Sequence, residues 1–158
     1  GSLYLRLSTR TLEQPTRSMK DVSSENIISG AYWEIAPAQN TKHVIAYTGA
    51  VAPEAAQAAA KTGAALLAIT SADRLHQQWT EMGARSHIHR LLSEAPSQIK
   101  IVSVLDGHPA TLSWLGGVNG QAMRPLGVQS YGQSADIPDL YRIHRIDAAA
   151  IEQAVDGD

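Results

Sequence analysis

Short apolar runs separated by polar stretches divide the chain, and five of them have the pattern of β-strands. Ala64 to Thr70 is apolar at nearly every position, which is typical of a parallel strand that is covered on both faces. The other runs predicted as strands are Ala31 to Ile35, Lys42 to Tyr47, Ile99 to Leu105 and Met123 to Val128. The central and C-terminal parts of the chain therefore carry the sheet.

Helical patterns alternate with these strands. Pro53 and Glu54 suit the first turn of a helix, and Gly63 is predicted to stop this helix after Lys61. Further helices are predicted over Ser71 to Met82, Ser86 to Glu94, Thr111 to Leu115, Pro138 to His144 and Ala148 to Ala154. Because alternating strands and helices pair in parallel through right-handed crossovers, we expect an α/β fold. It is a three-layer α/β/α domain with a mostly parallel sheet of about five strands, in which one edge strand could be antiparallel.

The N-terminal stretch has a different character. Tyr4 to Ser8 alternates apolar and polar residues, as a half-buried strand does, whereas Thr9 to Asn26 is polar and follows neither period. Leu3 enters the strand directly, and Gly1-Ser2 resembles the remnant of a cleaved tag, so we expect a piece of a longer protein. Residues 1–26 are predicted to be the end of a preceding domain and a linker, and residues 27–158 the domain itself.

Composition excludes several classes of function. The 158 residues carry 13 Lys and Arg against 15 Asp and Glu, so the chain lacks the positive charge of a nucleic-acid-binding protein, and no nucleic-acid partner is expected. Cysteine is absent, which excludes disulfides and thiolate metal sites. No apolar run approaches the roughly 20 residues of a membrane helix. We therefore expect no membrane contact and a cytoplasmic location.

Two short motifs invite a ligand interpretation. His87-Ile88-His89 could suggest a metal site, but residues two apart point to different faces of a helix, so solvated or capping histidines are the better expectation. Thr48-Gly49-Ala50 joins a strand to a helix, but it has one glycine where a dinucleotide loop needs three. We expect a tight turn there, and no metal site.

The turn Asp106-Gly107-His108-Pro109 follows a strand, at the edge where open α/β sheets place functional groups. No Gly-x-Ser-x-Gly elbow accompanies these residues, so a serine triad is not indicated. The favoured prediction is that Asp106 caps the helix at Thr111. An alternative is a small-molecule site formed by Asp106, His108 and Thr48.

Arg10 and the loop around Gly132 complete the candidates. Arg10 follows the first predicted strand, where it is either a solvated linker cation or a clamp that holds a carboxylate or phosphate through two parallel hydrogen bonds. Tyr131 and Gln133 flank a glycine that permits a left-handed backbone. They serve either a contact between domains or subunits or packing within the domain, and the residues alone favour neither.

Several stretches resemble one known family. Tyr4 to Arg10, Val104 to Ala110, Leu126 to Val128 and Tyr131 to Asp147 are together similar to the C-terminal domain of transketolase-family thiamine-diphosphate enzymes. The similarity is greatest to the E1 component of pyruvate (2-oxo acid) dehydrogenase. It covers most of the chain, is specific at the C-terminal end and is vague between Arg74 and Ser97.

The resemblance implies a non-catalytic domain that supports dimerisation and active-site architecture. In the homodimeric E1 enzymes, an oxidoreductase activity uses thiamine diphosphate and Mg²⁺, which are held by the preceding domains, so no catalytic, cofactor or metal residue is expected here. The implied partners are those domains of the same chain, a second copy and the lipoyl acyltransferase E2. Arg10 corresponds to a substrate-side position, and the loops with Asp106, His108, Tyr131 and Gln133 are implied to lie at an interface or the approach to the active site.

Two alternatives stay open. The same domain occurs in transketolase and in deoxyxylulose phosphate synthase, and in transketolase the arginine at a place similar to that of Arg10 touches the substrate phosphate. Here Thr11-Leu12-Glu13-Gln14-Pro15 follows it in place of the transketolase pattern Gln-Asn-Leu-Pro, which favours a 2-oxo acid over a sugar phosphate. The other alternative is a stand-alone regulatory module that binds a small molecule.

Overall fold

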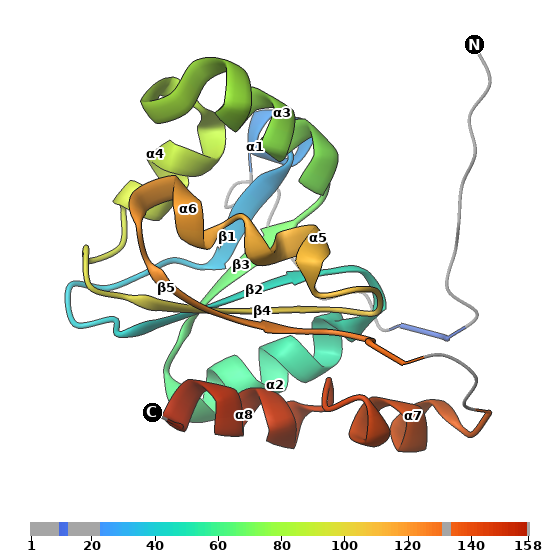
Figure 1. Ribbon diagram of the computed structural model, residues 1–158. Helices are drawn as coiled ribbons and strands as arrows, with labels where there is room; N and C mark the ends of the chain where they lie inside the picture. Colours follow the sequence, from blue (N-terminus) through green and yellow to red (C-terminus); the bar gives the residue numbers. More distant parts are fainter. Residues whose placement is uncertain (1–9, 13–22, 131–133, 158) are drawn as a thin grey trace, which may run out of the picture.

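The computed structural model describes residues 10–12, 23–130 and 134–157, and within them it has one sheet of five strands (Figure 1). The predicted strand at Tyr4 to Ser8 lies outside the described residues. The strands are β1 (Ala31–Ile35), β2 (His43–Thr48), β3 (Ala65–Ile69), β4 (Lys100–Leu105) and β5 (Ala122–Leu126). They lie in the order β1-β3-β2-β4-β5; β1 pairs antiparallel with β3, and the other pairs are parallel. The expected fold class, including an antiparallel edge, is confirmed.

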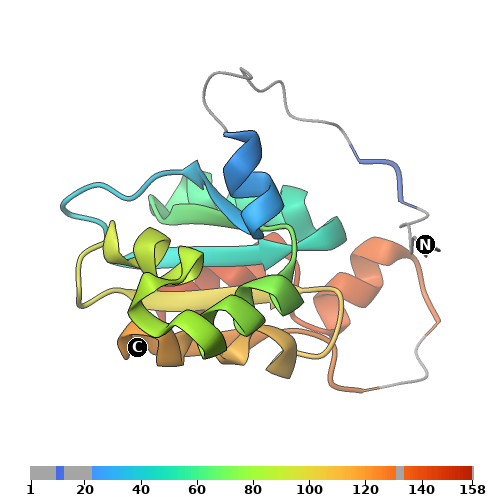
Figure 2. The same ribbon diagram turned by 90° about the horizontal axis from the view of Figure 1, so that it is seen from above.

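Helices cover both faces of this sheet (Figures 1 and 2). One layer consists of α2 (Ala52–Thr62), α7 (Ile137–Ile143) and α8 (Ala148–Asp156). The other consists of α3 (Ala72–Met82), α4 (His87–Ser93), α5 (Ala110–Ser113) and α6 (Gly116–Asn119). The 3₁₀ turn Gly49–Val51 links β2 to α2, and the 3₁₀ turn Gly83–Arg85 links α3 to α4. Among the described helices, none has the length and apolar character needed to cross a membrane.

The apolar pattern explains the layers. All five residues of β3 are buried, because alternate side chains enter the cores on opposite faces of the sheet. Leu67 and Ile69 pack with α3 and α4, whereas Leu66 and Ala68 pack with α2 and α8. The α2 face is rich in alanine, which lets this helix approach the sheet and α8 closely.

Glycine and proline set the limits of α2 as the sequence predicted. Pro53 and Glu54 lie in its first turn, and Gly63 ends the helix with a φ of 71°, in the left-handed region that favours glycine. The N–H of Gly63 donates to the carbonyl of Ala59, which satisfies one of the last carbonyls of the helix.

The polar stretch that was predicted as a linker ends in a helix that the sequence did not indicate. Residues 24–26 belong to α1 (Ser24–Ser29), which Ser23 caps by accepting a hydrogen bond from the N–H of Glu25 at 3.1 Å. Gly30, with φ 111°, ends the helix. The capping residues Ser23 and Gly30 enclose a helix in a polar stretch, and none of the helix residues is buried. Hydrophobic periodicity therefore could not reveal this helix.

His87 is neither solvated nor a cap, contrary to the prediction. It is 6% exposed, and its Nε2 lies 2.8 Å from the carbonyl oxygen of Ala31, which ties α4 to the start of β1. Its neighbour His89 is half-buried, and its Nδ1 lies 3.4 Å from Ser93 Oγ. Within the described residues, no group of three or more metal-ligating side chains occurs.

The strand order creates a switch point in the middle of the sheet. From β2 the chain crosses to β3 on one side, whereas from β4 it crosses to β5 on the other. Thr48 and Leu105, the last residues of β2 and β4, are paired neighbours, so the two following loops leave in opposite directions from one edge. Open α/β sheets bind ligands outside such a point.

Candidate functional site

Three of the loops at the carboxyl edge of the sheet follow β2, β4 and β5. Gly49, with φ 77°, makes the tight turn that the sequence predicts after β2. Gly107 accepts a hydrogen bond at its carbonyl from the N–H of Val128 at 2.8 Å, which joins the loop after β4 to the end of β5. Gly127 allows this approach, because a Cβ there would lie 2.5 Å from the Gly107 oxygen.

The predicted cap at the start of α5 was assigned to the wrong residue. The N–H of Ala110 donates to Nδ1 of His108 at 3.2 Å, and the Asp106 side chain makes no cap. The turn after β4 is tight, and His108 lies two residues before the first residue of α5. Its imidazole ring therefore lies next to the N–H of Ala110, one of the N–H groups that a helix start leaves without a partner in the helix. Asp106 is exposed, and its charge acts on Tyr141 of α7 instead.

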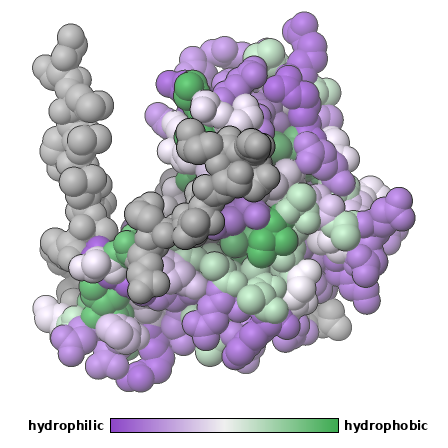
Figure 3. All heavy atoms as spheres, turned by 180° about the vertical axis from the view of Figure 1, so that it is seen from behind, coloured by the Kyte–Doolittle hydropathy of each residue, from purple (hydrophilic) through white to green (hydrophobic). Residues whose placement is uncertain are grey.

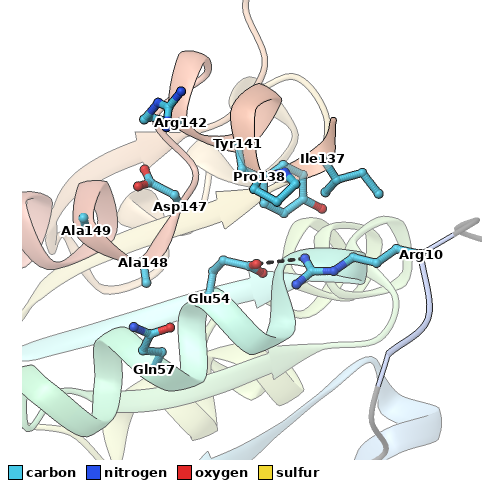
Figure 4. Close-up of a pocket in the computed structure, with 10 residues that line it drawn as sticks. All are labelled: Arg10, Glu54, Gln57, Ile137, Pro138, Tyr141, Arg142, Asp147, Ala148 and Ala149. Atoms are coloured by element: carbon cyan, nitrogen blue, oxygen red, sulfur yellow. Dashed lines mark ion pairs between the residues drawn. The ribbon is translucent and has the colours of Figure 1, made fainter. Parts of the chain in front are cut away.

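A cleft of about 580 Å³ lies where the first turns of α2 face α7 and the start of α8 (Figure 4). Its apolar part is formed by Ile137, Pro138 and two alanines of α8. Its polar groups are Arg10, Glu54, Gln57, Tyr141, Arg142 and Asp147. Arg10, near the N-terminus, thus contributes to a cleft whose other residues come from α2, α7, α8 and Asp147 just before α8.

Arg10 contacts at least three groups among the described residues. Its Nη1 lies 2.8 Å from Glu54 Oε1 and 3.4 Å from the carbonyl oxygen of Ala50. Its guanidinium carbon lies 5.4 Å from the centre of the Tyr141 ring. Figure 4 shows the Glu54 carboxylate directed at the guanidinium, with the Tyr141 ring beside the pair. The side chains of Arg10 and Glu54 are 25% and 16% exposed, so the ion pair is largely shielded from water.

Electrostatics at this cluster shift two pKa values. Burial by itself would lower the pKa of the Arg10 guanidinium, but the hydrogen bond and charge of Glu54, with a smaller effect of Tyr141, leave it raised. Burial raises the pKa of the Tyr141 hydroxyl, and the Asp106 charge raises it further, while Arg10 offsets part of this. The cluster therefore favours a charged Arg10 beside a neutral Tyr141.

Replacing Tyr141 by phenylalanine is expected to make the stability of the domain less sensitive to alkaline pH. Because the folded-state pKa of Tyr141 is raised, its contribution is fully present below the unfolded pKa of about 10 and is lost as the pH rises through the folded value. Thermal unfolding of both proteins between about pH 8 and about pH 11 measures this. Parallel curves for the two proteins would show that Tyr141 is not responsible.

The structure joins some of the sequence-predicted residues and separates others. Arg10 and Asp106 both act on Tyr141, whereas His108 does not line the cleft and serves the start of α5. Tyr131 and Gln133 lie outside the described residues. The substrate-side role of Arg10 stays a prediction. The sequence analysis did not identify Glu54 and Tyr141 as site residues. The acidic residue in the first turn of α2 could have indicated Glu54, but it was interpreted only as stabilising the helix.

The cleft does not suit a magnesium diphosphate. The two arginines that line it are each paired with a carboxylate, Arg10 with Glu54 and Arg142 with Asp139, and the described residues contain no cluster of three metal-ligating side chains. Diphosphate binding generally uses backbone amides or cations that face the anion, with carboxylates holding the metal. The described lining of the cleft therefore does not match this pattern.

Comparisons with known proteins identify the fold. The sequence matches no protein-family model and no curated protein. Transketolase from Leishmania mexicana is similar in structure, with a TM-score of 0.65 and 16% identity over 85% of this chain and 18% of that one. A transketolase from Pichia stipitis, in complex with sedoheptulose 7-phosphate, has a TM-score of 0.62 and 18% identity, over 90% of this chain and 20% of that one.

A third neighbour is described as the inactive β4 tetramer of a split-gene transketolase. It has a TM-score of 0.61 and 13% identity, and the match covers 89% of this chain and 45% of that one. The chain thus spans about a fifth of the first two neighbours and under half of the third. At these identities the likeness shows the fold alone, and that fold is the one of the transketolase C-terminal domain.

Proposed function

We propose that this chain is the C-terminal domain of a thiamine-diphosphate enzyme of the transketolase family. The observation that carries the proposal is the asymmetry of the match: it covers 85% of this chain but 18% of the Leishmania enzyme. A whole domain therefore corresponds to a minor part of a much larger protein. In this proposal residues 1–26 end the preceding domain and link it to the domain over 27–158.

The proposed role is to support the active site and the dimer, with thiamine diphosphate and Mg²⁺ held by the preceding domains. A neighbour of this fold is described as inactive, which agrees with a domain that does not catalyse by itself. Seen from behind, the surface carries an apolar area right of the centre and a smaller one at the lower left (Figure 3). Large apolar side chains that are exposed include Ile27, Ile28 and Ile35. Exposed apolar surface of this kind is suited to contacts with another domain or a second copy.

Within the family, we propose that the longer protein is the E1 component of a 2-oxo acid dehydrogenase, such as pyruvate dehydrogenase. Arg10 is paired with Glu54, so its charge is already largely balanced, which weakens the attraction that it offers to a doubly charged phosphate. The residues after Arg10 also depart from the transketolase pattern. An acyltransferase E2 is the further partner, and the loops with Asp106 and His108 are the proposed approach to the active site, together with Tyr131 and Gln133.

The test is to express this domain together with the region encoded upstream of it. The longer protein is assayed with thiamine diphosphate and Mg²⁺ on pyruvate, 2-oxobutyrate and branched 2-oxo acids, with a ketose phosphate as the alternative substrate. We expect decarboxylation of a 2-oxo acid by the longer protein and none by the 158-residue chain. Turnover of the ketose phosphate alone would establish a transketolase instead, and an upstream region without thiamine-dependent activity would refute the proposal.

The cleft of about 580 Å³ favours one other candidate, a module that binds a small regulatory molecule. Its volume lies in the range of sites for small ligands. A panel of metabolites and nucleotides, screened by thermal stabilisation of the chain, tests this candidate. Saturable stabilisation by one compound would support the regulatory module. If no compound changed the unfolding temperature, the regulatory module would be refuted and the supporting domain would stay the proposal.

A further inference from the structure

The groups around Arg10 form a seat that matches a guanidinium. Glu54 supplies a carboxylate from the first turn of α2, the carbonyl of Ala50 supplies a second acceptor, and the ring of Tyr141 supplies an aromatic face from α7. A guanidinium is planar, has several donors in fixed directions and stacks on aromatic rings, whereas an ammonium is a point charge. The seat therefore suits arginine better than lysine.

Glu54 depends on this cation. Its side chain is 16% exposed, and its second carboxylate oxygen, Oε2, is buried without a hydrogen-bond partner among the described residues. A carboxylate that is largely removed from water is costly unless an opposite charge accompanies it. Arg10 is the cation that the structure places on Glu54, at 2.8 Å.

We propose that this seat is a guanidinium-binding site whose resident ligand is Arg10, and that it latches the segment before the domain onto the carboxyl edge of the sheet. The latch connects elements that are far apart in sequence, because Arg10 contacts residues 50, 54 and 141. It goes beyond the proposed function and does not depend on it. When Arg10 is removed, the seat accepts a free alkylguanidinium of the same chemistry.

Trypsin reports directly on the latch, because the protease must take the Arg10 side chain into its own pocket before it cuts the Arg10–Thr11 bond. The rate of this cut, relative to the cut of an unstructured arginine peptide added to the same digestion, follows the fraction of Arg10 that has left the seat. We expect Glu54→Gln to raise this relative rate about five- to tenfold, because hydrogen bonds to charged groups are among the stronger ones. An unchanged relative rate would refute the latch.

Two controls exclude a general loss of structure. Glu81→Gln makes the same chemical change at an exposed residue of α3, on the other layer, and is expected to leave the relative rate unchanged. Cutting after Lys61, within α2, reports on unfolding and should stay slow in Glu54→Gln. If Glu81→Gln or cutting at Lys61 accelerated as much as the cut at Arg10, the effect would be global and the latch would be wrong.

Chemical rescue tests the ligand class independently. In Arg10→Ala, methylguanidinium is expected to shift the backbone amide NMR signals of Ala50, Glu54 and Tyr141 in a saturable way, whereas methylammonium at equal concentration is not. The unaltered chain should not respond, because Arg10 fills the seat. Equal responses to the two cations, or equal responses of the two proteins, would show that no guanidinium site exists there.

Discussion

Replacing Gly127 by alanine is expected to destabilise the domain by about 2 to 3 kcal/mol, the range in which overpacking of a tight site falls. A Cβ at this position would lie 2.5 Å from the carbonyl oxygen of Gly107 and 2.9 Å from the nitrogen and Cδ of Pro109. Two of these atoms are backbone, so a rotamer change cannot relieve the contact. The loops after β4 and β5 would have to separate, which strains the hydrogen bond from Val128 to Gly107.

Gly107→Ala is the matched control for this prediction. Its Cβ would meet a Leu105 side-chain carbon at 3.4 Å, which is ordinary contact, so we expect less than about 1 kcal/mol of change. Urea denaturation of both variants gives the two free energies of unfolding. Equal losses at Gly107 and Gly127 would contradict the close approach of the two loops at this edge.

Truncation of Ile151 to alanine is expected to cost about 3 kcal/mol, in the middle of the range for buried isoleucine. Ile151 lies on α8, is fully buried and belongs to the core between the sheet, α2 and α8. Removing its larger side chain leaves a cavity that the alanine-rich face of α2 has little side-chain volume to fill.

Ile143→Ala makes the same change on the neighbouring helix α7, where the side chain is 51% exposed. We expect it to cost about 0.5 kcal/mol, because it removes little buried area. The difference between the two variants, measured by thermal or urea unfolding, tests whether α8 closes this face of the sheet. Similar costs would contradict the packing of α8 against α2.

The strands were predictable because their apolar pattern reflects burial directly. Ala64 to Thr70 was expected to be covered on both faces, and β3 is buried at every position. The limits of α2 followed from Pro53 and Gly63, whose conformational preferences are local and need no knowledge of the fold. The direction of β1 was foreseen only as an open possibility, because pairing depends on contacts between strands distant in sequence.

The site was harder to predict for the same reason. Arg10, Glu54 and Tyr141 are separated by long stretches of chain, and no short motif contains two of them. Glu54 has the place of an ordinary acidic residue in the first turn of a helix, α2. Tyr141 is one residue of a short helix, α7, and nothing in the sequence distinguishes it from a packing residue. His87 was assigned to solvent because its partner, the carbonyl of Ala31, is a backbone group that residue types do not reveal.

The proposed role of this chain is that of a supporting C-terminal domain in a thiamine-diphosphate enzyme. The most direct measurement compares the longer protein with the same protein lacking residues 23–158, by thiamine-dependent turnover of 2-oxo acids and by light scattering. We expect the complete protein to be an active dimer, and the shortened protein to lose turnover and to dissociate. Full activity and an intact dimer in the shortened protein would contradict the account.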